Sequence, residues 1–196
     1  NIDADDSIAY ISEQCLTDSN IVIMSTDKDF LQLVDDRVSV WSPVRKKLYK
    51  PNDILEEYGI DSKNYIWYRV LDGDKSDNIP GVKGLGLKTI QKKFPFLNEN
   101  RIVNIGEVIK ELPNAKEVIE LNYKLMQLSN VDISGNAKMK IRNLVNNPIQ
   151  RLIKVDFQKM FLEDKLYAAL PNLNSWLATT FNRLNNMAEK SYGKKT

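Results

Sequence analysis

The sequence predicts an α/β protein with an open parallel-sheet core followed by a mostly helical lobe, and three observations predict this class. Helix and strand patterns alternate over the first 60 residues. The run Ile21–Met24 is apolar throughout and is bounded by turn residues, which is typical of a buried parallel strand. After residues 60–72 the strand patterns stop and helical patterns continue. We therefore expect a domain boundary in that region.

The core is expected to alternate between helices and strands. Its first helix has acids in its first turn, as the helix dipole favours. Its last helix begins well at Pro51, because proline is tolerated in a first turn, and is expected to end near Gly59. In order, the predicted elements are a helix at 3–16, a strand at 21–24, a short helix at 30–34, a strand pair at 38–41 and 47–49, and a helix at 51–59.

The lobe is expected to be helical, with a glycine-rich stretch near its start. Its predicted helices are 65–71, 87–94, 105–112, 115–128, 152–161 and 176–187. The end of the chain, 190–196, is expected to be a flexible tail.

Composition limits the chemistry that the chain can perform. It has 196 residues and no histidine, which excludes Ser-His-Asp and Cys-His catalysis and histidine-containing zinc sites. Its single cysteine, Cys15, excludes an internal disulfide framework and agrees with a cytoplasmic location. No apolar run approaches the ~20 residues of a membrane span, so no membrane partner is expected. Carboxylates and hard metal ions remain as the means of catalysis.

Charge is segregated along the chain although the net charge is only +2. The first 36 residues carry nine acids against Lys28, whereas 37–50 carry five bases and no acid. A second basic stretch covers 80–101. An acidic pocket beside basic stripes suits a protein that holds a polyanion next to bound cations. Solvated charged faces would give the same pattern.

Three acidic motifs stand out. Asp3-Ala-Asp5-Asp6 opens a helix, Asp27-Lys-Asp29 follows the apolar strand, and Asp74-Lys-Ser-Asp77 follows an apolar helix. Acids at the carboxyl end of a parallel strand lie where open α/β sheets bind ligands. Carboxylates brought together repel one another, and divalent cations relieve that repulsion. Each motif could equally be a helix cap or a turn, because aspartate favours both.

The glycine-rich stretch predicts a nucleic-acid contact. Gly84-Leu-Gly86 allows a tight turn with positive φ, and a helix follows at once. Free N–H groups at that helix start, with lysines along the helix, favour a phosphate backbone. The residues expected to contact DNA are Gly81, Val82, Lys83, Gly84, Leu85, Gly86, Lys88, Thr89, Lys92 and Lys93. An ordinary loop is the alternative, whereas the spacing matches neither a P-loop nor a dinucleotide fingerprint.

These motifs, in this order, resemble those of 5′→3′ exonucleases and flap endonucleases. The resemblance rests on Asp72–Val82 with Gly84–Thr89, on Ser25–Leu33, and on Asp3–Asp6. Trp41-Ser-Pro43 is most similar to the RNase H of T-even phages, which removes RNA primers. The likeness is clear to about Lys93 and looser beyond it.

The resemblance implies a truncated PIN-like (Rossmann-like) core at 1–60, which would bind metal, and a helical DNA-binding lobe at 61–189. It also implies a helix-hairpin-helix (helix-three-turn-helix) at about 70–94. The implied cofactors are two Mg²⁺ or Mn²⁺ ions, with K⁺ at the hairpin. The implied metal ligands are Asp3, Asp5, Asp6, Asp27, Asp29, Asp74 and Asp77. The implied catalytic residues are Asp5, Asp27, Asp29 and Asp74.

Two features depart from the family pattern. Asp3 stands where the family has glutamate, so its carboxylate is one methylene shorter. The family's earlier strand with a metal-binding aspartate, a further acid and the basic helical arch have no counterpart in the sequence. We therefore expect weak or absent catalysis from this polypeptide alone.

Three functions stay open from the sequence. The first is a 5′ nuclease acting on DNA or RNA/DNA with 5′ ends or flaps, with a replication protein as a further partner. The second is a module that binds the DNA backbone without cleaving it. The third is a more distant PIN-like RNase, which the hairpin disfavours because such RNases generally lack it.

Overall fold

The structure is a computed structural model that describes residues 2–147 and 151–192. The chain forms two compact units, Asn1–Val145 and Asn146–Thr196, and each is described by itself. Within the described residues, no helix is both long and apolar enough to cross a membrane.

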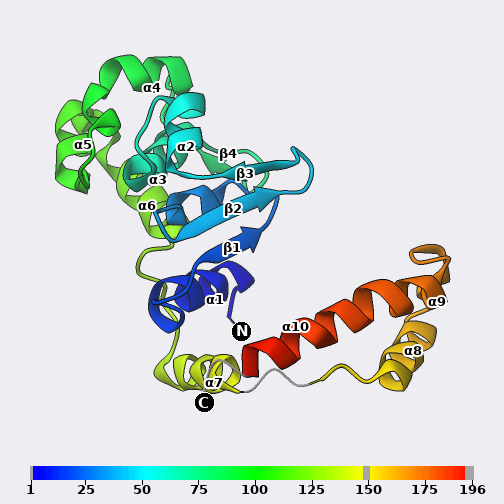
Figure 1. The fold of residues 1–196 in the computed structure, drawn as a ribbon. Helices are drawn as coiled ribbons and strands as arrows, with labels where there is room; N and C mark the ends of the chain where they lie inside the picture. Colours follow the sequence, from blue (N-terminus) through cyan, green and yellow to red (C-terminus); the bar gives the residue numbers. More distant parts are fainter. Residues whose placement is uncertain (1, 148–150, 193–196) are drawn as a thin grey trace. The chain divides into compact units, whose positions relative to one another are not determined.

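The first unit contains a three-stranded sheet in the order β1-β2-β3 (Figure 1). Strand β1 (Ile21–Met24) runs parallel to β2 (Val38–Ser42), which pairs antiparallel with β3 (Lys47–Tyr49). The predicted strands and the parallel direction of β1 are confirmed. The prediction that β1 is buried is wrong, because Val22 is 59% and Met24 72% exposed. Strand β1 pairs only with β2 among the described strands, which leaves these side chains uncovered.

The helices predicted for the first unit are confirmed within a few residues. They are α1 (Ala4–Tyr10) with its π-helical extension Ile11–Cys15, the 3₁₀-helix Asp29–Leu33, α2 (Pro51–Tyr58), α3 (Tyr65–Asp72), α4 (Leu87–Lys93), α5 (Ile105–Glu111) and α6 (Lys116–Met126). Helix α2 shows why the local signals succeed. Pro51 occupies its first turn, and Gly59 ends it with a φ of 62°.

Two strands and one α-helix of the first unit were not predicted. Strands β4 (Gly73–Asp74) and β5 (Ile79–Pro80) form a short antiparallel pair, and α7 (Gly135–Asn146) follows α6. Helix α7 buries only Ala137, so its apolar periodicity is faint. The cationic groups of Lys138 and Arg142 lie 5.6 and 5.7 Å from the centre of the Tyr10 ring, which connects α7 to α1.

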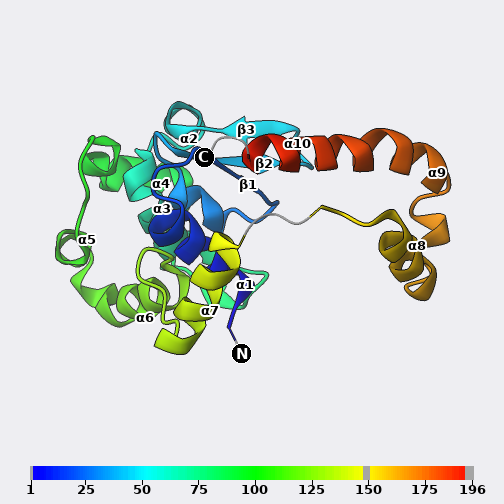
Figure 2. The ribbon, with the colours of Figure 1, turned by 60° about the horizontal axis from the view of Figure 1, so that its bottom comes forward.

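One hydrophobic core runs through the first unit from Ala9 to Ala137. Helices α3 and α6 pack side by side (Figures 1 and 2), and the rings of Trp67 and Tyr123 stack between them at 5.0 Å. The boundary expected at residues 60–72 does not coincide with the division of the structure at Val145. The physical reason is that the apolar side chains of α3 belong to the same core as the sheet.

The second unit contains α8 (Lys154–Glu163), α9 (Leu173–Trp176), a π-helical stretch Leu177–Phe181 and α10 (Asn182–Tyr192). Its core is aromatic, with the rings of Phe157 and Trp176 stacked at 5.0 Å. Of the tail predicted at 190–196, residues 190–192 belong to α10, and 193–196 lie outside the described residues.

Candidate functional site

The second acidic motif lies at the carboxyl end of β1. The backbone N–H of Ser25 still donates to the carbonyl of Trp41 on β2, and the chain then turns. Within the turn, the N–H of Asp27 donates to Ser25 Oγ at 3.0 Å, and the N–H of Asp29 donates to Asp27 Oδ1 at 2.8 Å. Asp29 is half-buried and begins the 3₁₀-helix, whereas Asp27 is exposed. The turn therefore fixes two carboxylates where a parallel sheet presents its ligands.

The third acidic motif is held by the pair β4–β5. The φ of Gly73 is 76°, and its backbone lies so close to Gly81 that a Cβ on either glycine would collide with backbone atoms. Asp74 Oδ1 accepts hydrogen bonds from the backbone N–H and the hydroxyl of Ser76. These contacts fix the loop that carries Asp74 and Asp77.

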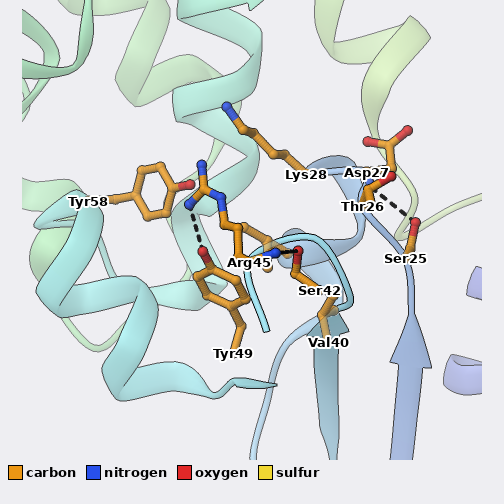
Figure 3. Close-up of a pocket in the computed structure, with 10 residues that line it drawn as sticks. Ser25, Thr26, Asp27, Lys28, Val40, Ser42, Arg45, Tyr49 and Tyr58 are labelled. Atoms are coloured by element: carbon orange, nitrogen blue, oxygen red, sulfur yellow. Dashed lines mark hydrogen bonds between the residues drawn. The ribbon is translucent and has the colours of Figure 1, made fainter. Parts of the chain in front are cut away.

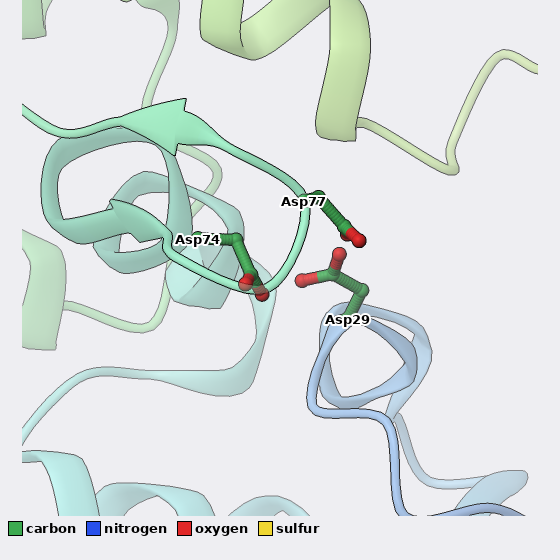
Figure 4. Close-up of side chains that lie close together, drawn as sticks. All are labelled: Asp29, Asp74 and Asp77. Atoms are coloured by element: carbon green, nitrogen blue, oxygen red, sulfur yellow. The ribbon is translucent and has the colours of Figure 1, made fainter.

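The two motifs meet in space (Figure 4). Ligand oxygens of Asp29, Asp74 and Asp77 all lie within 4.8 Å of one another. Asp74 and Asp77 line a cleft of about 480 Å³ together with Asp27 and Arg69. Three carboxylates in this arrangement can hold a divalent cation, since hard cations prefer several oxygen ligands.

Of the acids in the first motif, Asp5 interacts most directly with Asp27 and Asp29 of the second motif. Burial raises the pKa of Asp5, and the negative charges of Asp27, Asp3 and Asp29 raise it further. Asp3 caps α1, with its Oδ1 accepting from the N–H of Asp5 at 3.4 Å. The structure thus brings Asp5 towards the second motif, while Asp3 also performs the capping role considered from the sequence.

Asp6 faces a different neighbour. Burial raises its pKa, followed by the charges of Asp3 and of Asp132. Asp132 lies in the segment between α6 and α7, and no sequence pattern connects it with the first motif. Asp6 therefore interacts with acids other than those of the Asp29 cluster.

Arg69 is the main residue that the sequence patterns missed. It lies on α3, its side chain is only 6% exposed, and its Nε donates to Asp29 Oδ1 at 2.5 Å. Its Nη2 donates to Asp74 Oδ2. The available signal was a charged residue within the apolar run of α3.

The two carboxyls bonded by Arg69 have pKa values shifted in opposite directions. Burial raises the pKa of Asp29, although Arg69 opposes this. The hydroxyl of Ser76 is the largest influence on Asp74, and together with Arg69 it outweighs burial and lowers the pKa of Asp74 to about 2.

Two amides of the structure also escaped the sequence patterns. On α6, Asn122 Nδ2 donates to the carbonyls of Val70 and Pro80, at the two ends of the Asp74 loop. Gln32 Nε2 donates to the carbonyls of Asp29 and Met126 at 2.9 and 3.0 Å. Helix α6 and its end therefore support both acidic turns.

A smaller pocket lies beside the second motif (Figure 3). It has a volume of about 20 Å³, enough for one water, and is bordered by Asp27, Lys28 and Arg45. The guanidinium of Arg45 is already engaged by the hydroxyl of Tyr49 at 2.7 Å and by Glu57 at 2.6 Å. The hydrogen bonds of Arg45 therefore stabilise the β2–β3 hairpin.

The glycine-rich loop joins α3 to α4. Gly84 has a φ of 83°, as the tight turn requires, but Gly86 does not adopt positive φ, since its φ is −111°. A Cβ on either glycine would meet no atom within 4 Å. Val82 and Leu85 pack partly against the core, so their side chains anchor the loop. The remaining polar candidates are exposed, namely Lys83, Lys88, Thr89, Lys92 and Lys93.

The sequence of the chain is similar to those of known nucleases and polymerases. Residues 1–59 match the family described as the 5′-3′ exonuclease, N-terminal resolvase-like domain. The chain is similar to the 5′-3′ exonucleases, and the family match lies in its first 59 residues. It is 34% identical over 174 residues to a 5′-3′ exonuclease of Aquifex aeolicus (strain VF5), an alignment covering 84% of the chain and 60% of that protein. With a thermostable DNA polymerase I of Thermus thermophilus, it is 36% identical over 131 residues, covering 65% of the chain and 15% of the polymerase.

Two solved structures share the fold of this chain. A T5 5′-exonuclease matches with a TM-score of 0.60 and 23% identity, covering 74% of the chain and 65% of that protein. The flap endonuclease of bacteriophage T5, solved as a pseudo-enzyme-product complex with DNA and metal ions, has the same TM-score and identity, covering 74% of the chain and 58% of that protein. The chain spans about 60% of the length of the Aquifex exonuclease. The α/β fold with attached helices is therefore shared with the T5 enzyme.

Proposed function

We propose that the chain is the metal-binding and DNA-gripping part of a structure-specific 5′ nuclease. Its reaction is hydrolysis of phosphodiester bonds in flap, nicked or RNA-primed DNA, in replication or repair. The observation that carries this proposal is the meeting of Asp29, Asp74 and Asp77 within 4.8 Å, because they come from two loops far apart in sequence. The similarity to 5′-3′ exonucleases adds support. A replication protein as partner and a bacterial or phage-infected cytoplasm belong to the same proposal.

The proposed cofactors are two divalent ions, Mg²⁺ or Mn²⁺. The carboxylates of Asp29, Asp74 and Asp77 would hold one, with Asp5 and Asp27 beside them. Burial is the largest cause of the raised pKa of Asp5, and the charges of Asp27, Asp3 and Asp29 add to it; this repulsion supports the assignment, because a cation relieves it. Asp3 and Asp6 are proposed as outer ligands. When bound, such ions supply an activated water and stabilise charge on the phosphodiester.

The proposed DNA grip is a helix-hairpin-helix formed by α3, the glycine-rich loop and α4. Open space over Gly84 and Gly86 supports it, because a phosphate backbone can then approach the loop closely. Exposed Lys83, Lys88 and Lys92 supply positive charge, which grips phosphates without reading bases. A K⁺ ion at this loop is part of the proposal.

Cleavage of a labelled 5′-flap duplex by the purified chain tests the function. With Mg²⁺ or Mn²⁺ present, we expect weak cleavage that Asp27→Asn abolishes while DNA affinity is retained. Asp18→Asn is the matched control, because Asp18 is an exposed acid outside the three motifs. DNA binding without cleavage in either metal would overturn the nuclease function of this chain and favour a non-catalytic DNA-binding module.

A further inference from the structure

Arg69 is the only charged residue that is buried among those the structure describes. An unpaired buried charge is costly, so a guanidinium in this position needs hydrogen-bonding partners. Arg69 has two, and both are carboxylates proposed to hold metal. Arg69 therefore interacts with the buried side of the carboxylate group Asp29, Asp74 and Asp77, and not with residues at the surface.

The geometry uses one oxygen of each acid. Nε of Arg69 bonds Oδ1 of Asp29, and Nη2 bonds Oδ2 of Asp74. Figure 4 shows the carboxylate of Asp29 between Asp74 and Asp77, with one oxygen directed towards each. Within the described part of the chain, no protein donor bonds Oδ2 of Asp29 or the carboxylate of Asp77.

We infer that Arg69 is a positioning residue of the metal centre, which fixes the carboxylates of Asp29 and Asp74 at the separation that a divalent cation requires. This inference rests on the proposed function. Arg69 touches neither substrate nor reacting atoms in this role. It acts because its planar guanidinium joins a residue that precedes it by 40 positions to one that follows it by five.

Charge and geometry predict opposite effects of removing Arg69. If Arg69 acted only through its positive charge, its removal would lower the repulsion of a cation and tighten metal binding. If it positions the two carboxylates, its removal lets them separate, and metal binding weakens. Outer partners of metal ligands typically change affinity roughly 10–100-fold when mutated. A substitution that preserves charge but not geometry distinguishes the two roles.

The test is calorimetric titration of the full chain with Mn²⁺, without DNA. Arg69→Lys retains the charge but not the two-armed donor, and Arg69→Gln removes the charge. We expect both to weaken Mn²⁺ binding by about 10-fold or more, with Lys the milder change. Arg101→Lys is the matched control, because Arg101 also bonds two carboxylates, those of Glu99 and Glu107, at an exposed site. Its Mn²⁺ affinity is expected to equal that of the unmodified chain.

The outcomes separate this inference from the proposed function. Unchanged or tighter Mn²⁺ binding by both Arg69 variants would overturn the positioning role while leaving the metal centre intact. Absence of Mn²⁺ binding by the unmodified chain would overturn the metal centre, and the positioning role with it. Far-UV circular dichroism at the titration temperature establishes that each variant is folded. If Arg69→Gln is unfolded, Arg69→Lys decides, since it keeps the buried charge paired.

Discussion

The side-chain nitrogen of Asn122 lies 3.0 Å from the carbonyl oxygen of Val70, and donates a hydrogen bond to it. The same nitrogen donates to the carbonyl of Pro80 at 2.8 Å. Val70 is near the end of α3 and Pro80 lies in β5, so one buried amide joins both ends of the segment that carries Asp74. Asn122 thereby couples the stability of the fold to the geometry of the acidic cluster.

Replacing Asn122 by alanine should destabilise the chain by about 2–3 kcal/mol, because two carbonyls would lose their donor. Urea unfolding monitored by circular dichroism measures this. Asn52→Ala, at an exposed position of α2, should stay within roughly 0.5 kcal/mol of the unmodified chain. Equal effects of the two substitutions would refute the bridging role of Asn122.

Gly81→Ala and Gly84→Ala should differ sharply. A Cβ on Gly81 would collide with the carbonyl of Asp72, so we expect a loss of about 3 kcal/mol or more. Gly84 has open space around it and carries only the strain of its φ of 83°, which costs alanine about 1–2 kcal/mol. Thermal unfolding of both variants measures the order. A greater loss at Gly84 would contradict the close approach at Gly81.

Asp5→Asn should stabilise the metal-free chain at pH 7. Because the folded-state pKa of Asp5 lies above its ordinary value of 3.8, its contribution to stability is complete below that value and is lost as pH rises through the folded pKa. The amide removes this loss, so we expect the Tm of the metal-free chain at pH 7 to increase. Added Mn²⁺ should then stabilise the unmodified chain more than the variant. A lower Tm without metal would contradict the prediction.

Asp74→Asn should have the opposite dependence on pH. Its folded pKa of about 2 lies below the ordinary 3.8, so its contribution is present above pH 3.8 and is lost as pH falls through about 2. The difference corresponds to about 2 kcal/mol. Urea unfolding at pH 5 should therefore show a loss of this size in Asp74→Asn, and the loss should become small near pH 2. A loss independent of pH would exclude a charge-dependent contribution.

The exposed lysines of α4 should determine DNA affinity uniformly across sequences. Replacing Lys88 and Lys92 by alanine should weaken binding to any duplex and reduce the slope of log K against log salt by about 2. Fluorescence anisotropy at several salt concentrations measures both. The matched control is Lys110→Ala with Lys116→Ala, on α5 and α6. A loss confined to particular base sequences would contradict backbone gripping.

Most elements of the first unit could be predicted because their signals are local. The apolar run at β1, the proline that starts α2 and the positive φ of Gly84 depend on a few adjacent residues. Helix α7 could not be predicted, since a helix that buries only Ala137 carries little periodicity. The exposure of β1 also escaped prediction, because it depends on which strand lies beside it.

The sequence by itself determined the residue types of the site. Absent histidine and three aspartate motifs left hard cations and carboxylates as its chemistry. Only the tertiary structure decided that Asp29, Asp74 and Asp77 meet, and that Arg69 joins the first two. Such contacts depend on the packing of α3 against the 3₁₀-helix at Asp29, and no local pattern of residues encodes the distance between two segments 40 positions apart.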